Sequence, residues 1–305
     1  LTAENDFIVL EGDEYLSSPI DSRPKFHLYK PNIALLSGIA WDHINVFPTF
    51  ENYIEQFKIF TDSMIHGGSM MYNEEDEIVK DVVESSENHI KKYPYATPNH
   101  FIDNGITFLE TAEGDLPLEI FGIHNLQNLA GAKWICQHMG IDEDGFYEAI
   151  GSFSGASKRL EKIAETSSTV VFKDFAHSPS KVKATTKAVK EQYAERTVLA
   201  CLELHTYSSL DATFLSEYKG SLDAACKAVV FYSPDAVKIK QLDEVTKQQI
   251  TNAFERDDLI IYTNPEEFKD FLFNENLEKT ALILMSSGNY GGLNFEEVTR
   301  FASVL

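Results

Sequence analysis

The sequence predicts an α/β protein with two domains, of which the second is Rossmann-like with a mostly parallel sheet. From residue 169 onward, short apolar runs alternate with helical patterns, which is typical of a parallel sheet with helices on both faces. A length of 305 residues suits two domains that each bury a core of their own. The content of 43% hydrophobic and 24% charged residues is that of a globular protein.

The first half of the chain contains several predicted elements. Apolar runs at residues 7–10 and 33–36 predict two strands, the first of them buried. Aromatic and aliphatic residues recur at helical spacing from Phe50 to Met64, which predicts a helix with one face on the core. Residues 106–109 and 118–121 are predicted to form antiparallel strands separated by a turn.

A further helix is predicted after Asn125, because apolar residues recur every three or four positions at Leu126, Leu129, Ala132, Ile135 and Met139. Asn125 stands at the expected N-cap, where its side chain would bond the free amides of the first turn. Alternatively, this helix N-terminus faces a nucleotide, because its backbone amides and dipole favour anionic ligands.

The second half predicts five strands, at residues 169–172, 198–202, 228–232, 259–262 and 281–285. Helical patterns lie between or after them, at residues 182–193, 242–254 and 265–273, and a final helix starts at Asn294. Glu297 is placed to complete a capping box there.

Charge and composition exclude some classes of partner. A net charge of −22 argues against nucleic acid or an anionic membrane surface. The sequence has neither an apolar run that could span a bilayer nor an N-terminal secretory signal. Its three cysteines are dispersed without metal-ligand spacing, and Cys136 and Cys201 lie in apolar patterns, which favours buried thiols in a reducing cytoplasm for these two.

Sequence blocks across nearly the whole chain resemble the Mur ligases, the ATP-dependent amino-acid and peptide ligases of cell-wall synthesis. In chain order, the matching blocks are Glu11-Gly12-Asp13-Glu14-Tyr15, Trp41-Asp42-His43, Gly122-Ile123-His124-Asn125 with Asn128, Phe153-Ser154-Gly155 with Arg159 and Glu161, and Lys173-Asp174-Phe175-Ala176-His177-Ser178-Pro179.

One motif of that family is not found in this sequence. Mur ligases hold the phosphates of ATP with a Gly-x-x-x-x-Gly-Lys-Ser/Thr loop, and no such loop occurs here. The resemblance therefore implies the remainder of a Mur-ligase central domain at residues 1–156, without the N-terminal part that carries the phosphate loop. A Rossmann-like C-terminal ligase domain follows at residues 157–305. We expect this fragment alone to be inactive.

The acidic block around Glu11 is either a solvated loop or a magnesium site, since Mg²⁺ prefers carboxylates, water and substrate phosphates. His43 follows a predicted strand and is either structural or a ligand. The resemblance implies that Glu11 and His43 serve the metal and the catalysis. The sequence departs from the family motif around His43, with Gly38 in place of an Asn and Asn45 in place of an Asp.

The resemblance also implies an ATP site. His124 and Asn125 would face the adenine, whereas Arg159 and Asp174 would contact phosphate and ribose; His177 is retained from the same motif. From the residues alone, Asp174 is either a turn residue or an acceptor for the two ribose hydroxyls. In both cases we expect its side chain to be exposed at the edge of the second sheet.

The run Ser286, Ser287, Gly288 and Asn289 follows the last predicted strand. Such a loop is either a tight turn or a weak phosphate signal. It resembles a loop of the muropeptide-recycling branch of the family, which lies near the incoming peptide and would make these four residues substrate-binding.

The resemblance implies an amide-bond ligase that uses ATP and Mg²⁺ and proceeds through an acyl phosphate. Its partners would be UDP-N-acetylmuramate and a short peptide or amino acid, with L-Ala-γ-D-Glu-meso-diaminopimelate preferred and L-alanine as the alternative. An alternative of another class is a non-catalytic, Mur-like binding protein without the phosphate loop. Neither nucleic-acid binding nor membrane insertion is expected.

Overall fold

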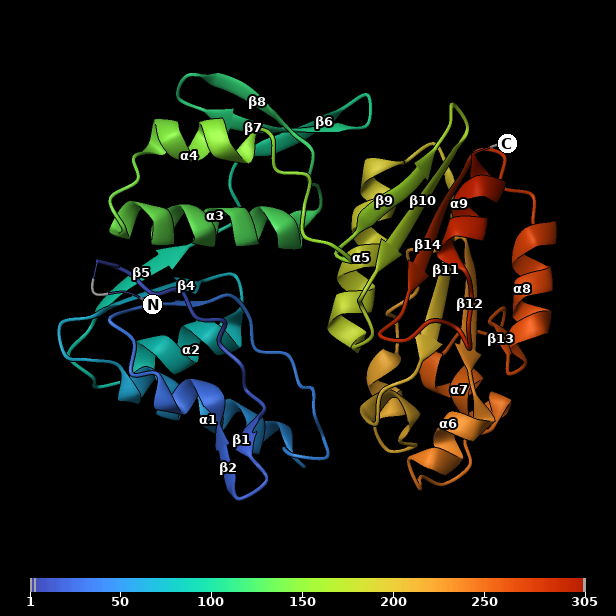
Figure 1. Ribbon diagram of the computed structural model, residues 1–305, viewed down its shortest axis with the longest axis horizontal. Helices are drawn as coiled ribbons and strands as arrows, with labels where there is room; N and C mark the ends of the chain where they lie inside the picture. Colours follow the sequence, from blue (N-terminus) through green and yellow to red (C-terminus); the bar gives the residue numbers. More distant parts are fainter. Residues whose placement is uncertain (1, 3, 304–305) are drawn as a thin grey trace. The chain divides into compact units, whose positions relative to one another are not determined.

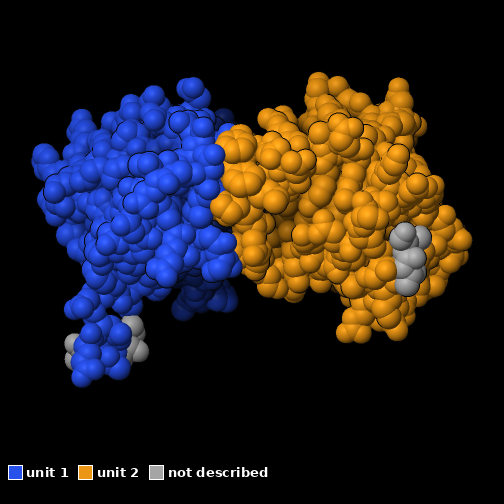
Figure 2. Space-filling view, turned by 90° about the horizontal axis from the view of Figure 1, so that it is seen from above, with its two compact units in different colours: residues 1–100, 109–116, 124–152 blue, residues 101–108, 117–123, 153–305 orange. Residues whose placement is uncertain are grey.

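The computed structural model describes residue 2 and residues 4–303, which form two compact units (Figure 2). Unit 1 comprises residues 1–100, 109–116 and 124–152, and unit 2 comprises residues 101–108, 117–123 and 153–305. None of the helices in the described part of the chain is long and apolar enough to cross a membrane.

Unit 1 is built on a parallel sheet in the order β3-β4-β5, with strands at Ile33–Leu36, Ser69–Asn73 and Lys91–Tyr95. Two helices, α1 (Phe50–Ser63) and α2 (Glu77–Ser85), contact each other and supply one side of its core. The predicted strand at residues 33–36 and the predicted helix from Phe50 are confirmed. The buried stripe of α1 consists of Tyr53, Phe57, Phe60 and Thr61.

Helix α3 (Ile123–His138) packs closely on this sheet in unit 1 (Figure 1). A Cβ atom on Gly131 would lie 2.9 Å from the Leu35 side chain and 3.1 Å from the Tyr95 hydroxyl. The absence of a side chain at Gly131 thus lets the helix backbone approach the strands. Helix α4 (Glu143–Ile150) follows, with Asp142 as its N-cap.

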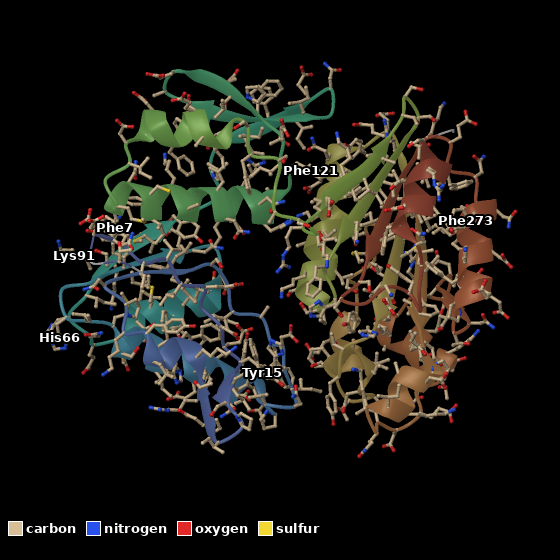
Figure 3. The ribbon with its side chains drawn as sticks, in the orientation of Figure 1. Phe7, Tyr15, His66, Lys91, Phe121 and Phe273 are labelled. Carbon is tan, nitrogen blue, oxygen red and sulfur yellow. The ribbon has the colours of Figure 1, made fainter. Side chains whose placement is uncertain are left out.

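The predicted buried strand at residues 7–10 is wrong. The segment pairs with no strand of the described residues, and Phe7 and Val9 are 49% and 78% exposed (Figure 3 labels Phe7). An apolar run becomes a buried strand only where a neighbouring strand can take its backbone hydrogen bonds. The chain next forms a short antiparallel pair, β1 (Leu16–Ser18) and β2 (Asp21–Pro24), and a 3-10 turn at Lys25–Leu28.

A separate three-stranded sheet has the order β6-β7-β8, with strands at His100–Asp103, Ile106–Thr111 and Gly114–Leu118. The predicted strand at residues 106–109 is confirmed, but the one at 118–121 is misplaced, since β8 already ends at Leu118. Gly114 begins this strand instead of forming the turn. β8 lies at the sheet edge, where Pro117 is tolerated because an edge strand has amides that need no partner.

Unit 2 contains a six-stranded sheet in the order β13-β12-β11-β14-β10-β9. The five predicted strands are confirmed as β10 (Thr169–Asp174), β11 (Thr197–Leu204), β12 (Lys227–Tyr232), β13 (Ile260–Tyr262) and β14 (Thr280–Met285). Neighbours among these five pair in parallel, whereas β9 (Glu161–Glu165), which was not predicted, pairs antiparallel with β10.

Helices cover both faces of this sheet (Figure 1). They are α5 (Pro179–Gln192), α6 (Pro234–Ile239), α7 (Lys247–Phe254), α8 (Pro265–Asn274) and α9 (Phe295–Ala302), with 3-10 turns at Ser208–Leu210 and Leu215–Tyr218. Helix α7 begins later than predicted because Thr246 and Gln249 form a capping box there. Asn294 caps α9, but the capping box predicted with Glu297 is wrong: Glu297 pairs with Lys269 at 3.0 Å.

Candidate active site

His43 lies on the loop that follows β3 in unit 1 and has an unusual backbone conformation. Its φ is 54°, in the left-handed region that non-glycine residues adopt at a cost. Its Nε2 atom lies 3.4 Å from Oε1 of Glu14, and its ring meets that of Tyr15 edge-on at 5.1 Å (Tyr15 is labelled in Figure 3). Such backbone strain occurs most often at functional sites.

Glu14, rather than the predicted Glu11, is the carboxylate beside His43. Tyr53 on α1 donates a hydrogen bond of 3.3 Å to Oε1 of Glu14. Burial raises the pKa of Tyr53, and the nearby carboxylates of Glu14 and Asp42 raise it further, so the phenol stays protonated. Glu11 is exposed, and its side chain makes no hydrogen bond or ion pair with the described residues.

The other acid of this block, Asp13, is engaged by a lysine. Its carboxylate lies 2.5 Å from Nζ of Lys25. Partial burial is the largest single influence and opposes ionisation, but the hydrogen bonds from Lys25 and the Tyr15 amide and the charge of Lys25 together lower the pKa of Asp13. Across residue 2 and residues 4–303, no three His, Cys, Asp or Glu side chains are grouped so as to hold a metal ion. The three acids of this block are therefore not brought together as one cluster, and whether the block binds magnesium stays a prediction.

His124 and Asn125 lie in the first turn of α3. The helix begins at Ile123, after Gly122 with φ of 87°, so the prediction that Asn125 is the N-cap is wrong. Because His124 and Asn125 are not apolar, the spacing of apolar residues did not indicate this start. Burial lowers the pKa of His124 to about 4, so its imidazole is neutral at pH 7 and offers one donor and one acceptor nitrogen.

Asp174 ends β10 in unit 2 and is buried, with only 6% of its surface exposed. Its Oδ2 accepts a hydrogen bond from the Leu160 amide and its Oδ1 one from the Ala176 amide, each at 2.5 Å. Burial raises the pKa of Asp174, although these two amides and the charge of Arg159 oppose the increase. The expectation of an exposed side chain is wrong, because backbone amides surround the carboxylate.

The other nucleotide-site candidates of unit 2 lie around Asp174. Arg159 is exposed, with its guanidinium carbon 5.5 Å from the centre of the Phe175 ring. His177 is mostly buried; its Nδ1 lies 2.8 Å from the Phe175 carbonyl oxygen, and its own carbonyl accepts from the Tyr218 hydroxyl. The contacts of these residues with a nucleotide stay a prediction.

The loop after β14 is fixed by Glu203, a residue that no sequence motif had singled out. Glu203 is 97% buried near the end of β11, and its Oε2 accepts from the Ser286 hydroxyl and, at 2.8 Å, from the Tyr290 amide. Ser286 Oγ in turn accepts from the Gly288 amide at 2.7 Å. A glutamate inside an otherwise apolar strand was the available signal, because a buried carboxylate needs dedicated partners.

Asn289, the last of the four predicted substrate-binding residues, is exposed on this loop. Its side-chain and backbone oxygens both accept from the Gly292 amide, at 3.2 Å and 3.0 Å. The loop thus makes a tight turn whose polar groups are largely used internally.

Each unit thus places candidate residues on a segment that follows a strand of its sheet, where ligands of α/β proteins bind. Two family models match the chain in order: the Mur ligase middle domain at residues 2–136 and the Mur ligase, glutamate ligase domain at residues 158–288. The chain belongs to the Mur ligase family.

Individual relatives support the family and the fold. A UDP-N-acetylmuramate–L-alanine ligase of Caldicellulosiruptor bescii is 28% identical over 74% of this chain and 50% of its own length. A murein peptide ligase structure from Psychrobacter arcticus superposes with a TM-score of 0.62 at 18% identity, over 96% of this chain and 62% of that one. The structure of a Thermotoga maritima MurF ligase in complex with ADP superposes with a TM-score of 0.64 at 16% identity, over 87% of this chain and 62% of that one. The chain spans about half the length of the first curated relative.

The backbone strain at His43 leads to a stability prediction. We expect His43→Gly to be more stable than His43→Ala by about 1–2 kcal/mol, because glycine adopts positive φ without steric cost and both variants lack the imidazole. Urea denaturation of the two variants measures the difference. Equal stabilities would show that the residue relaxes out of the left-handed region.

The burial of His124 predicts a pH dependence. The pKa is lower in the folded protein than the 6.5 of the free side chain, so only the unfolded state gains a proton as pH falls from about 6.5 to about 4. The stability contribution is present above pH 6.5 and is lost across this window, by roughly 3 kcal/mol. Melting temperatures should therefore fall less with acid in His124→Gln than in wild type. The exposed control His66→Gln should follow wild type; matching slopes in all three proteins would contradict the assignment.

Asp174→Asn should lower the free energy of unfolding by about 1–3 kcal/mol, because the amide group retains one acceptor oxygen for two buried N–H donors. The exposed control Asp223→Asn should change it by less than about 0.5 kcal/mol. Chemical denaturation compares them. An unchanged stability in Asp174→Asn would show that the Leu160 and Ala176 amides find other acceptors.

Proposed function

We propose that the protein acts as an ATP-dependent ligase that joins the carboxyl group of UDP-N-acetylmuramate to the amine of an amino acid. The observation that carries this proposal is the match of both Mur ligase domain models in the same chain, in their order. Ligation of this type activates the carboxylate by attack on the γ-phosphate of ATP. The amine then displaces phosphate from the resulting acyl phosphate.

The amine donor is proposed to be L-alanine. Several curated relatives of this chain bear the name UDP-N-acetylmuramate–L-alanine ligase, and one of them, from Porphyromonas gingivalis, is 26% identical over 93% of the chain. The loop at residues 286–289 resembles a loop of the muropeptide-recycling branch, and this resemblance favours a muropeptide as the donor instead. The murein peptide ligase supports that second candidate through its fold alone, because its identity to this chain is 18%.

Magnesium would offset the charge that gathers among phosphates and carboxylate. Its usual protein ligands are one or two carboxylates together with water and substrate phosphates, so a site without three grouped side chains suits it. Glu14 and His43 are the residues of unit 1 that would hold it, and Glu11, on the same exposed segment, is a further candidate. In this proposal the chain supplies these side chains from the segment at Glu11 to Glu14 and from the loop that carries His43.

We propose nucleotide-contacting residues within each unit, taken separately. His124 and Asn125 would face the base from the first turn of α3, where the neutral imidazole can accept or donate a hydrogen bond. Arg159 would contact phosphate. Asp174 would accept from the ribose hydroxyls through lone pairs that its backbone bonds leave over, since a carboxylate has about four acceptor positions. His177 would line the same strand end.

The test compares nucleophiles in the intact protein. With ATP, Mg²⁺ and UDP-N-acetylmuramate, L-alanine should give ADP and the UDP-N-acetylmuramoyl-L-alanine product by mass spectrometry. The chain of residues 1–305 alone should release no ADP, because it lacks the phosphate loop.

Other outcomes identify the alternatives. Turnover with L-Ala-γ-D-Glu-meso-diaminopimelate and not with L-alanine would establish the muropeptide ligase. Binding of UDP-N-acetylmuramate by the intact protein without ADP release under any of these conditions would establish a non-catalytic binding protein.

A further inference from the structure

Glu203 also faces a histidine on its own strand end. Oε1 of Glu203 lies 3.6 Å from Nδ1 of His205, while Oε2 is taken by Ser286 and Tyr290. The two side chains differ in exposure: Glu203 is 3% exposed and His205 is 44% exposed. A buried carboxylate thus lies behind one ring nitrogen of an imidazole that remains accessible to solvent.

The neighbouring loop is shaped around this pair. A Cβ atom on Gly288 would lie 2.8 Å from Oε2 of Glu203 and 3.0 Å from Cγ of His205, so the ring packs directly against the loop backbone. Ser287 follows Ser286, and its Oγ atom is buried without a hydrogen-bond partner among the described residues. Buried hydroxyls without partners are uncommon, and this one lies on the loop that resembles the family loop near the incoming peptide.

We infer that Glu203 and His205 form a carboxylate–imidazole pair that takes a proton from the incoming amine of the ligation reaction. This inference rests on the proposed function. At 3.6 Å the Glu203 carboxylate is too far from Nδ1 for a hydrogen bond, but its negative charge favours the tautomer with the proton on that atom. Nε2 is then the acceptor nitrogen, as in hydrolases with a histidine base. Glu203 is a positioning residue in this scheme, and His205 is the group that contacts the substrate.

The chemistry requires such a proton acceptor. An amino acid at neutral pH carries an ammonium group, which has no lone pair and cannot attack an acyl phosphate. Transfer of one N–H proton to Nε2 of His205 leaves a neutral amine, and the imidazolium formed faces the Glu203 carboxylate. The amine lone pair then forms the C–N bond, the C–O bond to phosphate breaks, and phosphate leaves with that electron pair. The second N–H proton is lost to the leaving phosphate or to solvent.

The experiment uses the intact protein with ATP, Mg²⁺ and UDP-N-acetylmuramate, and compares L-alanine with hydroxylamine, which is already neutral at pH 7. We expect His205→Gln to lower the rate with L-alanine by about 10²-fold, a usual contribution of a general base. The hydroxamate rate should stay within the same order of magnitude as in wild type. Glu203→Gln retains an acceptor for Ser286 and Tyr290 and should show a smaller loss confined to L-alanine.

The matched control is His66→Gln in unit 1, an exposed histidine, which should match wild type with both nucleophiles. Equal losses with L-alanine and hydroxylamine in His205→Gln would indicate a structural role and overturn the inference. An unchanged rate with L-alanine would also overturn it. If wild type forms neither product and releases no ADP, the proposed function itself fails, and the role of the pair fails with it.

Discussion

The two hydrogen bonds that Asp174 accepts from backbone amides organise the strand-end edge of unit 2. They connect the end of β10 to Leu160, which precedes β9, and to Ala176, which leads into α5. The Asp174 carbonyl also accepts from the Ser286 amide at 2.9 Å, so the loop after β14 is bound to the same residue. A buried carboxylate is costly without partners, and charge-assisted bonds to amides offset much of that cost.

Glu203 repeats this arrangement two strands further along the sheet, on β11, with β14 between it and β10. It fixes Ser286 and Tyr290, and Tyr290 in turn donates from its hydroxyl to the carbonyls of Cys201 and Met285. Loops that would otherwise vary in conformation are therefore held by acidic side chains from inside the sheet. This pre-organisation suits the proposed ligation, which would align a nucleotide, an activated carboxyl group and an amine.

The sequence predicted much of this fold because its strongest signals are local. The strands of unit 2 are continuous apolar runs, and the stripe on α1 recurs at helical spacing. The segment at residues 7–10 shows the same apolar signal, but whether it pairs depends on a neighbouring strand that its own residues do not specify. Helix α2 was not predicted because acidic residues conceal its buried face of Val79, Val82 and Val83.

The site residues were harder to place, since side-chain partners come from distant parts of the chain. The family resemblance pointed to Glu11, whereas the structure brings Glu14 to His43. The most direct test of the account is native-state hydrogen exchange at the amides of Leu160, Ala176 and Tyr290. If buried carboxylates hold this sheet edge, these three amides should exchange as slowly as those of β11. Exchange as fast as that of the exposed turn at Gly105 would contradict a sheet edge held by buried carboxylates.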